Sequence, residues 1–245
     1  MSVSGTTPDG AQTEQEASRW VRSMFGRVAP RYDLANHLLS ANIDVMWRNH
    51  TVRQVRDILM RPEARVMDLA CGTGDLLVAL EREAGRSLLG SDFCHPMLQG
   101  AGHKLRRLGL QSALLEADAL ALPLGDASLD LITIAFGFRN FSNYRAGLAE
   151  MRRVLRKGGA LAILEFTQPP NKAFAACYNW YTRHVLPLIG GMISGAPEAY
   201  RYLPESVRKF PAAPDLADMM REAGFGKVEW EYLTFGIVAL HIGRI

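Results

Sequence analysis

Val66–Asp75 reads Val-Met-Asp-Leu-Ala-Cys-Gly-Thr-Gly-Asp, and this decapeptide decides the fold. A short apolar run leads into an acidic residue, then into Gly72 and Gly74, and then into a helical pattern. The decapeptide therefore predicts a strand, a tight turn and a helix start, with glycines that let the backbone approach a ligand closely. An ordinary strand–turn–helix joint is the alternative, and the chain that follows argues against it.

The glycine turn departs from a dinucleotide-binding fingerprint at two points. Leu77 stands where that fingerprint has its third glycine. Asp75 falls at the start of the helix, where its carboxylate would repel a pyrophosphate. A ligand with positive charge and no phosphate suits the loop better. S-adenosylmethionine (SAM), which carries a sulfonium and an ammonium group, is the cofactor that we expect.

Further acidic residues follow the next apolar runs. Asp92 comes 20 residues after Gly72, a spacing at which a carboxylate accepts hydrogen bonds from ribose hydroxyls. Asp118 follows the third run, where it can accept a hydrogen bond from an adenine amino group. Because parallel strands present their carboxyl ends at one edge of a sheet, we expect a single nucleoside site. Its expected residues are Asp68, Gly72, Gly74, Asp92, Phe93, Met97, Asp118 and Ala135.

The composition is that of one globular domain. The chain has 245 residues, of which 48% are hydrophobic and 22% charged. Its 28 Lys and Arg against 25 Asp and Glu give a net charge of only +3, so we expect no nucleic-acid partner. Cys71, Cys94 and Cys177 lack metal-ligand spacing, and we interpret them as reduced thiols without a metal. With no signal-peptide pattern and no apolar run near ~20 residues, a cytoplasmic location is expected.

The expected organisation is a disordered tail over residues 1–16 and a single domain over 17–245. Residues 17–60 are helical in pattern, and 169–211 form an insertion that should cover the substrate. Strands are expected at 65–69, 87–92, 114–117, 129–135, 160–166, 227–234 and 237–243, and helices at 75–84, 96–108, 144–156 and 215–223. Lys157–Gly159 should cap the helix 144–156. This alternation predicts an α/β fold with a doubly wound, mostly parallel seven-stranded sheet and one antiparallel edge strand.

Four further segments have distinctive sequences: Phe25–Asp33, Phe136–Asn140, Tyr200–Ser206 and Gly236–His241. Together with the glycine loop they resemble class I SAM-dependent methyltransferases, and most closely the ubiquinone/menaquinone C-methyltransferases (UbiE-type). The resemblance extends from about Phe25 to the C-terminus. The chain departs from it at a few positions; Asp44 stands where the family often has His, and this is the departure nearest the expected substrate pocket.

The resemblance implies transfer of a methyl group from SAM to a ring carbon of a prenylated quinol. The expected reaction is demethylmenaquinol to menaquinol, with the benzoquinol step of ubiquinone synthesis as the alternative. The resemblance also adds Thr73 and Ala119 to the cofactor site. A methyltransferase of another small hydrophobic molecule and a non-catalytic nucleoside-binding module stay open as other classes, although the distinctive segments argue against both.

Methylation of carbon requires an electron-rich ring, which a hydroquinone provides when a phenolic proton leaves. The site therefore needs a base and donors that hold the phenolate oxygen. Arg139 and Asn140 follow the fourth strand and are candidates for the donors, since Arg139 has a pKa above ~12 and cannot be the base. His184 is the candidate base. The expected substrate contacts are Tyr32, Tyr200, Arg201 and Tyr202.

Phe174–Tyr181, with Val185–Ile193, supports two interpretations. It is either a core helix under the sheet edge or a cover for the isoprenoid tail of the substrate. An amphipathic insertion at a membrane surface would give a cytoplasmic enzyme access to a lipid substrate. We therefore expect a transient membrane-surface contact, peripheral to the inner membrane, and leave a homodimer open.

Overall fold

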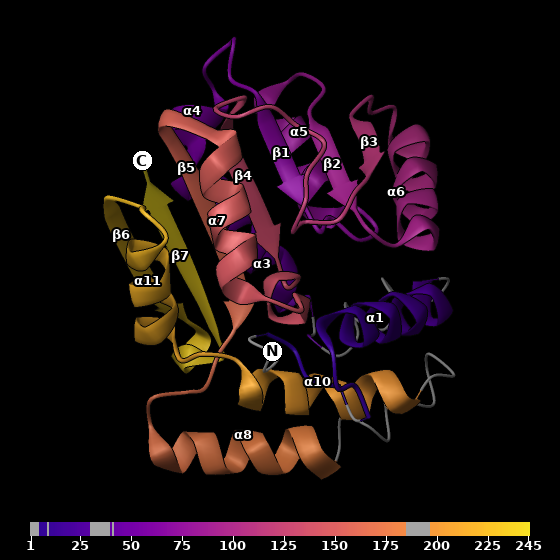
Figure 1. The fold of residues 1–245 in the computed structure, drawn as a ribbon, viewed down its shortest axis with the longest axis vertical. Coiled ribbons are helices and arrows are strands. Elements are labelled where there is room, and N and C mark those ends of the chain that lie inside the picture. Colours follow the sequence, from indigo (N-terminus) through magenta and orange to yellow (C-terminus); the bar gives the residue numbers. More distant parts are fainter. Residues whose placement is uncertain (1–4, 9, 30–39, 41, 185–196) are drawn as a thin grey trace.

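The computed structural model describes residues 5–8, 10–29, 40, 42–184 and 197–245. A seven-stranded sheet runs through the centre, and helices cover both of its faces (Figure 1). The strands are β1 (Val66–Leu69), β2 (Leu89–Asp92), β3 (Ala113–Glu116), β4 (Leu129–Ala135), β5 (Leu155–Phe166), β6 (Lys227–Leu233) and β7 (Val238–Arg244). The helices are α1 (Glu14–Val28), α3 (Ile43–Gln54), α4 (Arg56–Leu59), α5 (Asp75–Ala84), α6 (His95–Leu108), α7 (Tyr144–Val154), α8 (Lys172–His184), α10 (Pro197–Lys209) and α11 (Ala213–Glu222).

The strand order is β3-β2-β1-β4-β5-β7-β6. β1 to β5 pair in parallel, whereas β7 pairs antiparallel with both β5 and β6. The doubly wound, mostly parallel sheet is therefore confirmed. The antiparallel pairing is at the predicted edge, but the reversed strand is β7, one place inside the outermost strand β6.

The alternation of side chains along β5 shows how the sheet separates two cores. Leu161 and Ile163 face the core under α7 and α11. Ala160, Ala162 and Leu164 face the core under α3, α4 and α5. Because both faces of the central strands are covered, β1 and β4 are buried along nearly their whole length, which is typical of parallel sheets. The polar ends of the strands are left to form the site.

The predicted helix cap at Lys157–Gly159 is wrong. α7 ends at Val154, and Leu155 is already extended with φ −79° and ψ 133°. Leu155 pairs with Leu129, and the ladder then shifts register before Ala160 pairs with Leu131. Residues 156–159 thus lie in the irregular part of β5, where Gly158, with φ 79°, donates its N–H to the Ile245 carbonyl at 2.9 Å.

The predicted disordered tail also differs from the structure at the described residues. α1 begins at Glu14, after a capping box in which Thr13 and Glu16 bond each other's backbone N–H. Further upstream, the Thr6 N–H donates to the Phe141 carbonyl at 2.8 Å, and the Thr6 hydroxyl lies 2.7 Å from the Tyr202 hydroxyl. Residues 5–8 are thus part of the folded domain.

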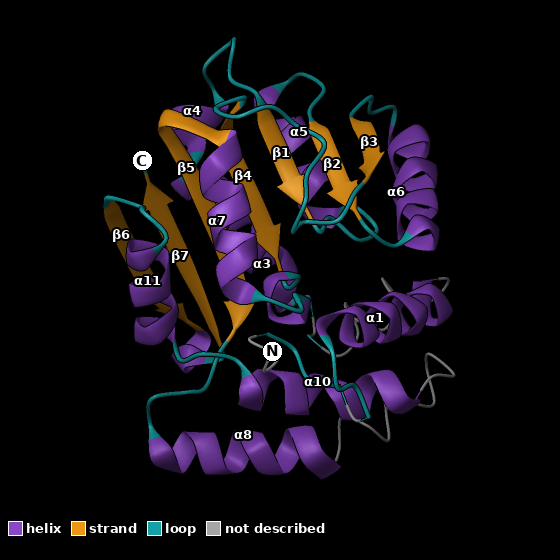
Figure 2. Ribbon diagram, in the orientation of Figure 1, coloured by secondary structure: helices purple, strands orange, loops and turns teal. Residues whose placement is uncertain are grey.

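α8 and α10 occupy most of the predicted insertion, below the carboxyl ends of the strands in the view of Figure 2. Residues 185–196 of the insertion lie outside the described residues. α10 contains Pro204 within the helix. Among the helices that the structure describes, none is long and apolar enough to cross a membrane.

Candidate active site

Two cavities open at the carboxyl ends of the strands. The first, of about 940 Å³ including the open solvent at its mouth, is lined by the loops that follow β1, β2, β3 and β4, and we call it the strand-end cavity. The second, of about 1760 Å³ on the same basis, is lined chiefly by α1, α3, α8 and α10, and we call it the helical cavity. Phe25, Arg48 and Phe136 line both. A molecule in one cavity therefore lies against the same side chains as a molecule in the other.

The strand-end cavity brings together every predicted cofactor residue except Gly74. Gly74 begins α5 instead, with φ 86°, a left-handed conformation that glycine adopts without strain. A Cβ built on it would lie 3.3 Å from the Cβ of Ala101 on α6. The predicted residues that line it are thus Asp68, Gly72, Thr73, Asp92, Phe93, Met97, Asp118, Ala119 and Ala135.

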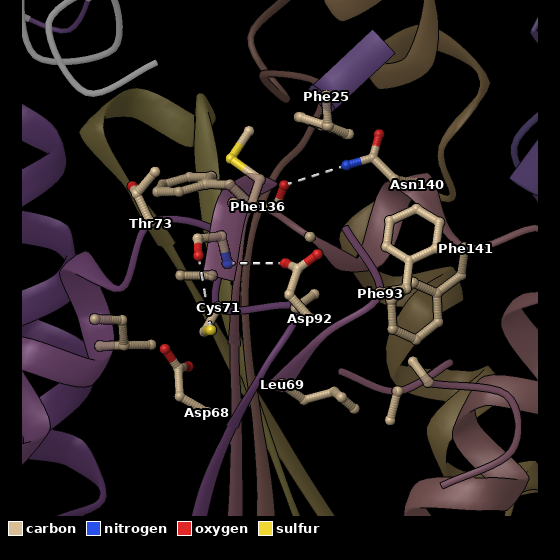
Figure 3. Close-up of a pocket in the computed structure, with 18 of the residues that line it drawn as sticks. Phe25, Asp68, Leu69, Cys71, Thr73, Asp92, Phe93, Phe136, Asn140 and Phe141 are labelled. Atoms are coloured by element: carbon tan, nitrogen blue, oxygen red, sulfur yellow. Dashed lines mark hydrogen bonds between the residues drawn. The ribbon is translucent and has the colours of Figure 1, made fainter. Parts of the chain in front are cut away.

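Asp92, the last residue of β2, ties two loops of the strand-end cavity together (Figure 3). Its Oδ2 accepts from the Gly72 N–H at 2.8 Å, the bond drawn to Asp92 in Figure 3. Its Oδ1 accepts from the Cys94 N–H at 2.9 Å. Burial raises the pKa of Asp92 to about 6. Each carboxylate oxygen has a further lone pair, so two ribose hydroxyls can still donate to it.

Asp68, on β1, is a buried carboxylate with one unsatisfied oxygen. Its Oδ1 accepts from the Thr133 hydroxyl at 2.8 Å, whereas Oδ2 has no hydrogen-bond partner among the described residues. Burial raises the pKa of Asp68 to about 7. A buried carboxylate without a partner is costly, and a cation beside it removes that cost. This oxygen fits the ammonium group of SAM.

Asp75, which should repel a phosphate at the start of α5, is itself held by two cations. Lys104 of α6 forms an ion pair with one oxygen, and Arg48 Nη2 lies 3.7 Å from the other. Lys104 Nζ also lies 3.5 Å from the Thr73 hydroxyl. The helix start is thus occupied by a paired carboxylate, which leaves no room for a phosphate there.

α1 covers the strand-end cavity, a feature that the sequence analysis missed. Ser18 and Phe25 of α1 line it. Arg22 fixes the helix in place, since its Nε donates to the Phe93 carbonyl at 2.7 Å and its Nη2 lies 3.3 Å from Glu116 Oε1. The sole signal for this cover was the distinctive segment that begins at Phe25.

The neighbouring residues Arg139 and Asn140 line different cavities. Arg139 lines the helical cavity, where its Nη1 lies 2.8 Å from Glu165 Oε1 in a buried ion pair. Asn140 lines the strand-end cavity, and its Oδ1 accepts from the Tyr202 hydroxyl at 3.0 Å. Tyr202 in turn lines the helical cavity. The sequence analysis missed Glu165, which sits inside an apolar strand pattern.

The other predicted site residues are only partly described. Tyr32 lies outside the described residues. His184 is on α8, and Tyr200 and Arg201 are on α10, but the structure does not describe these three side chains. No cluster of His, Cys, Asp or Glu that could hold a metal ion occurs among the described residues.

The helical cavity has a largely aromatic and aliphatic wall. Trp47, Phe136 and Phe166 pack on one another, with ring centroids 4.7 to 6.2 Å apart. Asp44 lines the same cavity; its Oδ1 accepts from the Ser40 hydroxyl at 2.6 Å and its Oδ2 is paired with Arg48. A flat apolar molecule can pack against this wall. The charged side chains of α3 and of Arg139 would then face its polar substituents.

Comparison with known proteins identifies the family. The model of the ubiE/COQ5 methyltransferase family matches residues 11–244. This chain belongs to that family. A demethylmenaquinone methyltransferase of Thermus thermophilus is 52% identical over 90% of the chain and 99% of its own length. A ubiquinone/menaquinone biosynthesis C-methyltransferase of Syntrophotalea carbinolica is 44% identical, covering 91% of the chain and 92% of its own length.

Solved structures show the same fold at low sequence identity. A SAM-dependent methyltransferase from Thermotoga maritima has a TM-score of 0.63 at 19% identity, and covers 91% of this chain and 98% of its own. The [4+2]-cyclase SpnF has a TM-score of 0.64 at 17% identity, with 93% and 78% covered. Because a cyclase shares the fold, the fold alone does not fix the reaction. The family assignment makes this chain a methyltransferase, and its fold is that of the class I, SAM-dependent enzymes.

Proposed function

We propose that the protein transfers the methyl group of SAM to a ring carbon of a prenylated quinol, converting demethylmenaquinol to menaquinol. The observation that carries the proposal is the pair of cavities with a shared wall of Phe25, Arg48 and Phe136. The Thermus relative and a Deinococcus radiodurans relative at 45% identity are both named demethylmenaquinone methyltransferase. Other relatives carry the double name of ubiquinone and menaquinone biosynthesis, so the benzoquinol is the second candidate.

SAM would occupy the strand-end cavity and supply an electrophilic methyl group on its sulfonium. Asp92 would hold the ribose hydroxyls, and Phe93 and Met97 would flank the adenine. The unsatisfied oxygen of Asp68 would receive the ammonium. These roles place the methionine end of the cofactor toward β1 and α3, where Arg48 reaches the helical cavity.

The quinol would occupy the helical cavity, with its ring against Trp47, Phe136 and Phe166. Arg139 would hold a ring oxygen as negative charge develops on it. Glu165 fixes the Arg139 guanidinium, because the Glu165 carboxylate also accepts a hydrogen bond from the Arg139 backbone N–H at 3.1 Å. Asn140 and Tyr202, joined by a hydrogen bond, would position the ring between the two cavities.

An aromatic path leads from the helical cavity to the surface, and we propose that it meets a membrane. Tyr178 lines the cavity. The Phe174 ring stacks on the Tyr178 ring with 6.4 Å between their centroids, and the centroids of Phe235 and Phe174 are 5.5 Å apart. Phe235 is 80% exposed, and Trp180 of α8 is 61% exposed. Thr234 and Phe235 hold this position with φ of 47° and 56°, which is costly for residues other than glycine.

The charge of this region favours an anionic lipid surface. Residues 166–197 contain no Asp or Glu, and they include Lys172 and Arg183. Lys and Arg side chains near a membrane surface are attracted to anionic headgroups by about 1 kcal/mol each. A prenyl chain could then pass along the aromatic path without leaving an apolar environment.

The proposed reaction is tested with purified protein, SAM, and short-chain demethylmenaquinol or demethyl-benzoquinol kept reduced under anaerobic conditions. We expect one methyl group to be added to the ring carbon of the naphthoquinol, and no turnover of the rigorously oxidised quinone. The electronic reason is that only the quinol provides a carbon nucleophile. Binding of SAM without methylation of either quinol would show that the acceptor is another molecule.

A further inference from the structure

We propose that Asp44 is the base that takes the hydroxyl proton of the acceptor during methyl transfer. The inference rests on the proposed function, because it needs a phenolic acceptor in the helical cavity. Asp44 lies in the first turn of α3 and is 4% exposed. It stands next to Trp47 on the cavity wall, one helical turn before Arg48, which lines both cavities.

The composition of the cavity wall singles out Asp44. Among the lining side chains that the structure describes, it is the sole carboxylate. Arginines are protonated at every accessible pH. Burial raises the pKa of Tyr178 to about 12 and also raises that of Tyr202, so neither is a base near neutral pH. Glu165 lies behind Arg139, 1% exposed, and does not line the cavity.

The contacts of Asp44 hold its carboxylate in one orientation. Ser40 donates to Oδ1 at 2.6 Å, and Arg48 pairs with Oδ2. Arg48 is fixed in turn by Asp75 at 3.7 Å and by the Phe136 ring, whose centroid lies 5.4 Å from the guanidinium carbon. A carboxylate oxygen accepts more than one hydrogen bond, so a phenolic O–H in the helical cavity can donate to the same carboxylate. Arg48, which lines both cavities, thus holds the Asp44 carboxylate from the side of the strand-end cavity.

The proton transfer balances with the methyl transfer. As the ring carbon bonds to the methyl carbon, the methyl–sulfur bond breaks and its electron pair stays on sulfur. The O–H bond electrons become the second bond of a carbonyl, and the proton goes to Asp44. The proton on the methylated carbon then leaves to water while the oxygen regains one from Asp44. Because the O–H becomes strongly acidic as the methyl bonds, a weak base such as a carboxylate suffices.

The charged and titratable groups around Asp44 come from every element that packs on α3 or faces it across the cavity. They are Arg48 of α3, Asp68 of β1, Asp75 of α5, Lys104 of α6, Arg139 after β4, Tyr178 and Tyr181 of α8, and Tyr202 and Arg208 of α10. Asp68 titrates near neutral pH and acts on cofactor binding. The pH profile of kcat must therefore be measured at saturating SAM.

The experiment compares Asp44→Asn, Asp44→His and Asp44→Ala in the quinol methylation assay. Loss of a general base lowers kcat by about 10²- to 10⁴-fold, so we expect that loss in Asp44→Asn with SAM affinity within about threefold of wild type. Asp44→His keeps a base, and the acid limb of its kcat profile should move up toward the ordinary histidine pKa of about 6.5. Formate, which fits the space that the carboxylate leaves, should restore activity to Asp44→Ala in a dose-dependent way.

Asp57→Asn is the matched control, since Asp57 is an ion-paired carboxylate on α4, 2.9 Å from Arg244, and lines neither cavity. It should leave kcat unchanged. The inference is overturned if Asp44→Asn keeps kcat within threefold of wild type. It is also overturned if Asp44→His keeps the wild-type profile, or if formate has no effect on a folded Asp44→Ala. A wild-type protein that methylates no quinol would instead overturn the proposed function.

Discussion

The two cavities that meet at Arg48 are built in different ways. The strand-end cavity is made of short loops, with Gly72 and Gly74 in left-handed conformations and two buried carboxylates, Asp68 and Asp92. The helical cavity is made of side chains on helices from both ends of the chain, arranged around aromatic rings and the ion pairs of Asp44 and Arg139. The first holds a ligand by backbone geometry and charge. The second presents chiefly an aromatic and aliphatic wall, with most of its charged groups in these ion pairs.

After the loss expected at Asp44, the largest expected effect also lies in the helical cavity, at Arg139. Arg139→Ala should lower kcat on the order of 10²-fold, because a preorganised donor to a developing oxyanion is lost. It should also destabilise the fold, by about 3–5 kcal/mol, since Glu165 stays buried without its partner. SAM affinity, measured by calorimetric titration, should stay near that of wild type.

A double variant separates these two effects. Arg139→Leu with Glu165→Leu removes the whole buried pair, which is often neutral or stabilising in itself. We expect the melting temperature to recover while kcat stays low. Recovery of both would assign Arg139 to the fold rather than to the reaction. Arg139→Lys should restore little activity, because lysine lacks the planar fork that contacts two acceptors at once.

The corresponding change in the strand-end cavity is Asp92→Ala. It should weaken SAM binding by roughly 1–3 kcal/mol through loss of charge-assisted hydrogen bonds to the ribose. Saturating SAM should restore most of kcat, in contrast to Arg139→Ala. Titration calorimetry measures the first quantity and initial rates the second. A normal SAM affinity would remove Asp92 from the cofactor site.

A third test uses the raised pKa of Asp68. Its ionised form attracts the SAM ammonium, and its pKa in the free protein is about 7. Ionisation on raising the pH through this value should tighten SAM binding, by about tenfold between pH 6 and pH 8. The Asp68→Asn variant should bind SAM weakly and lose most of this pH dependence. A smaller pH dependence should remain below pH 6, because the pKa of Asp92 is about 6.

The same pKa has a consequence for the stability of the free protein. In the folded state Asp68 keeps its proton up to about pH 7, whereas the unfolded chain loses it near the reference value of 3.8. The folded state therefore binds more protons between these values, and its stability falls as the pH rises through them. Thermal melts of the free protein should show Asp68→Asn to be more stable than wild type at pH 8. An equal or lower melting temperature would contradict the raised pKa.

The smallest effect is expected at the surface end of the aromatic path. Phe235→Asn, chosen because asparagine tolerates a positive φ, should reduce co-sedimentation with anionic vesicles a few-fold. It should raise the KM for a long-chain quinol in those vesicles and leave the KM for a short-chain soluble quinol unchanged. Tyr232→Asn on β6, at a residue 36% exposed, is the control. Equal losses in both variants would place the membrane contact elsewhere.

The contrast between the cavities also explains what the sequence could predict. Gly72 and Asp92 lie 20 residues apart, and Gly72 follows one strand while Asp92 ends the next, so local pattern placed them at one site. Phe25, Asp44 and Tyr178 reach the helical cavity from α1, α3 and α8, and no local pattern relates them. Glu165 was missed because the predicted strand 160–166 is otherwise apolar.

Lys157–Gly159 shows a second limit of the sequence. A lysine and two glycines are typical of a helix end, yet these residues continue β5 through its register shift, where Gly158 donates to the Ile245 carbonyl at 2.9 Å. Hydrogen bonds to a distant part of the chain thus outweigh the local cap signal. The same reason applies to Thr6, which polar composition assigned to a tail but which is buried against Phe141 and Tyr202.

The fluorescence of Trp47 can report whether the helical cavity is occupied. The indole is 4% exposed, lies on the cavity wall, and donates from Nε1 to the Thr234 hydroxyl at 2.8 Å. Oxidised quinones accept an electron from excited indole at contact distance, so a quinone in this cavity quenches the fluorescence of Trp47. The other three tryptophans, Trp20, Trp180 and Trp230, do not line the cavity. Titration of wild type against Trp47→Phe thus measures acceptor occupancy without turnover, even for an acceptor that is never methylated.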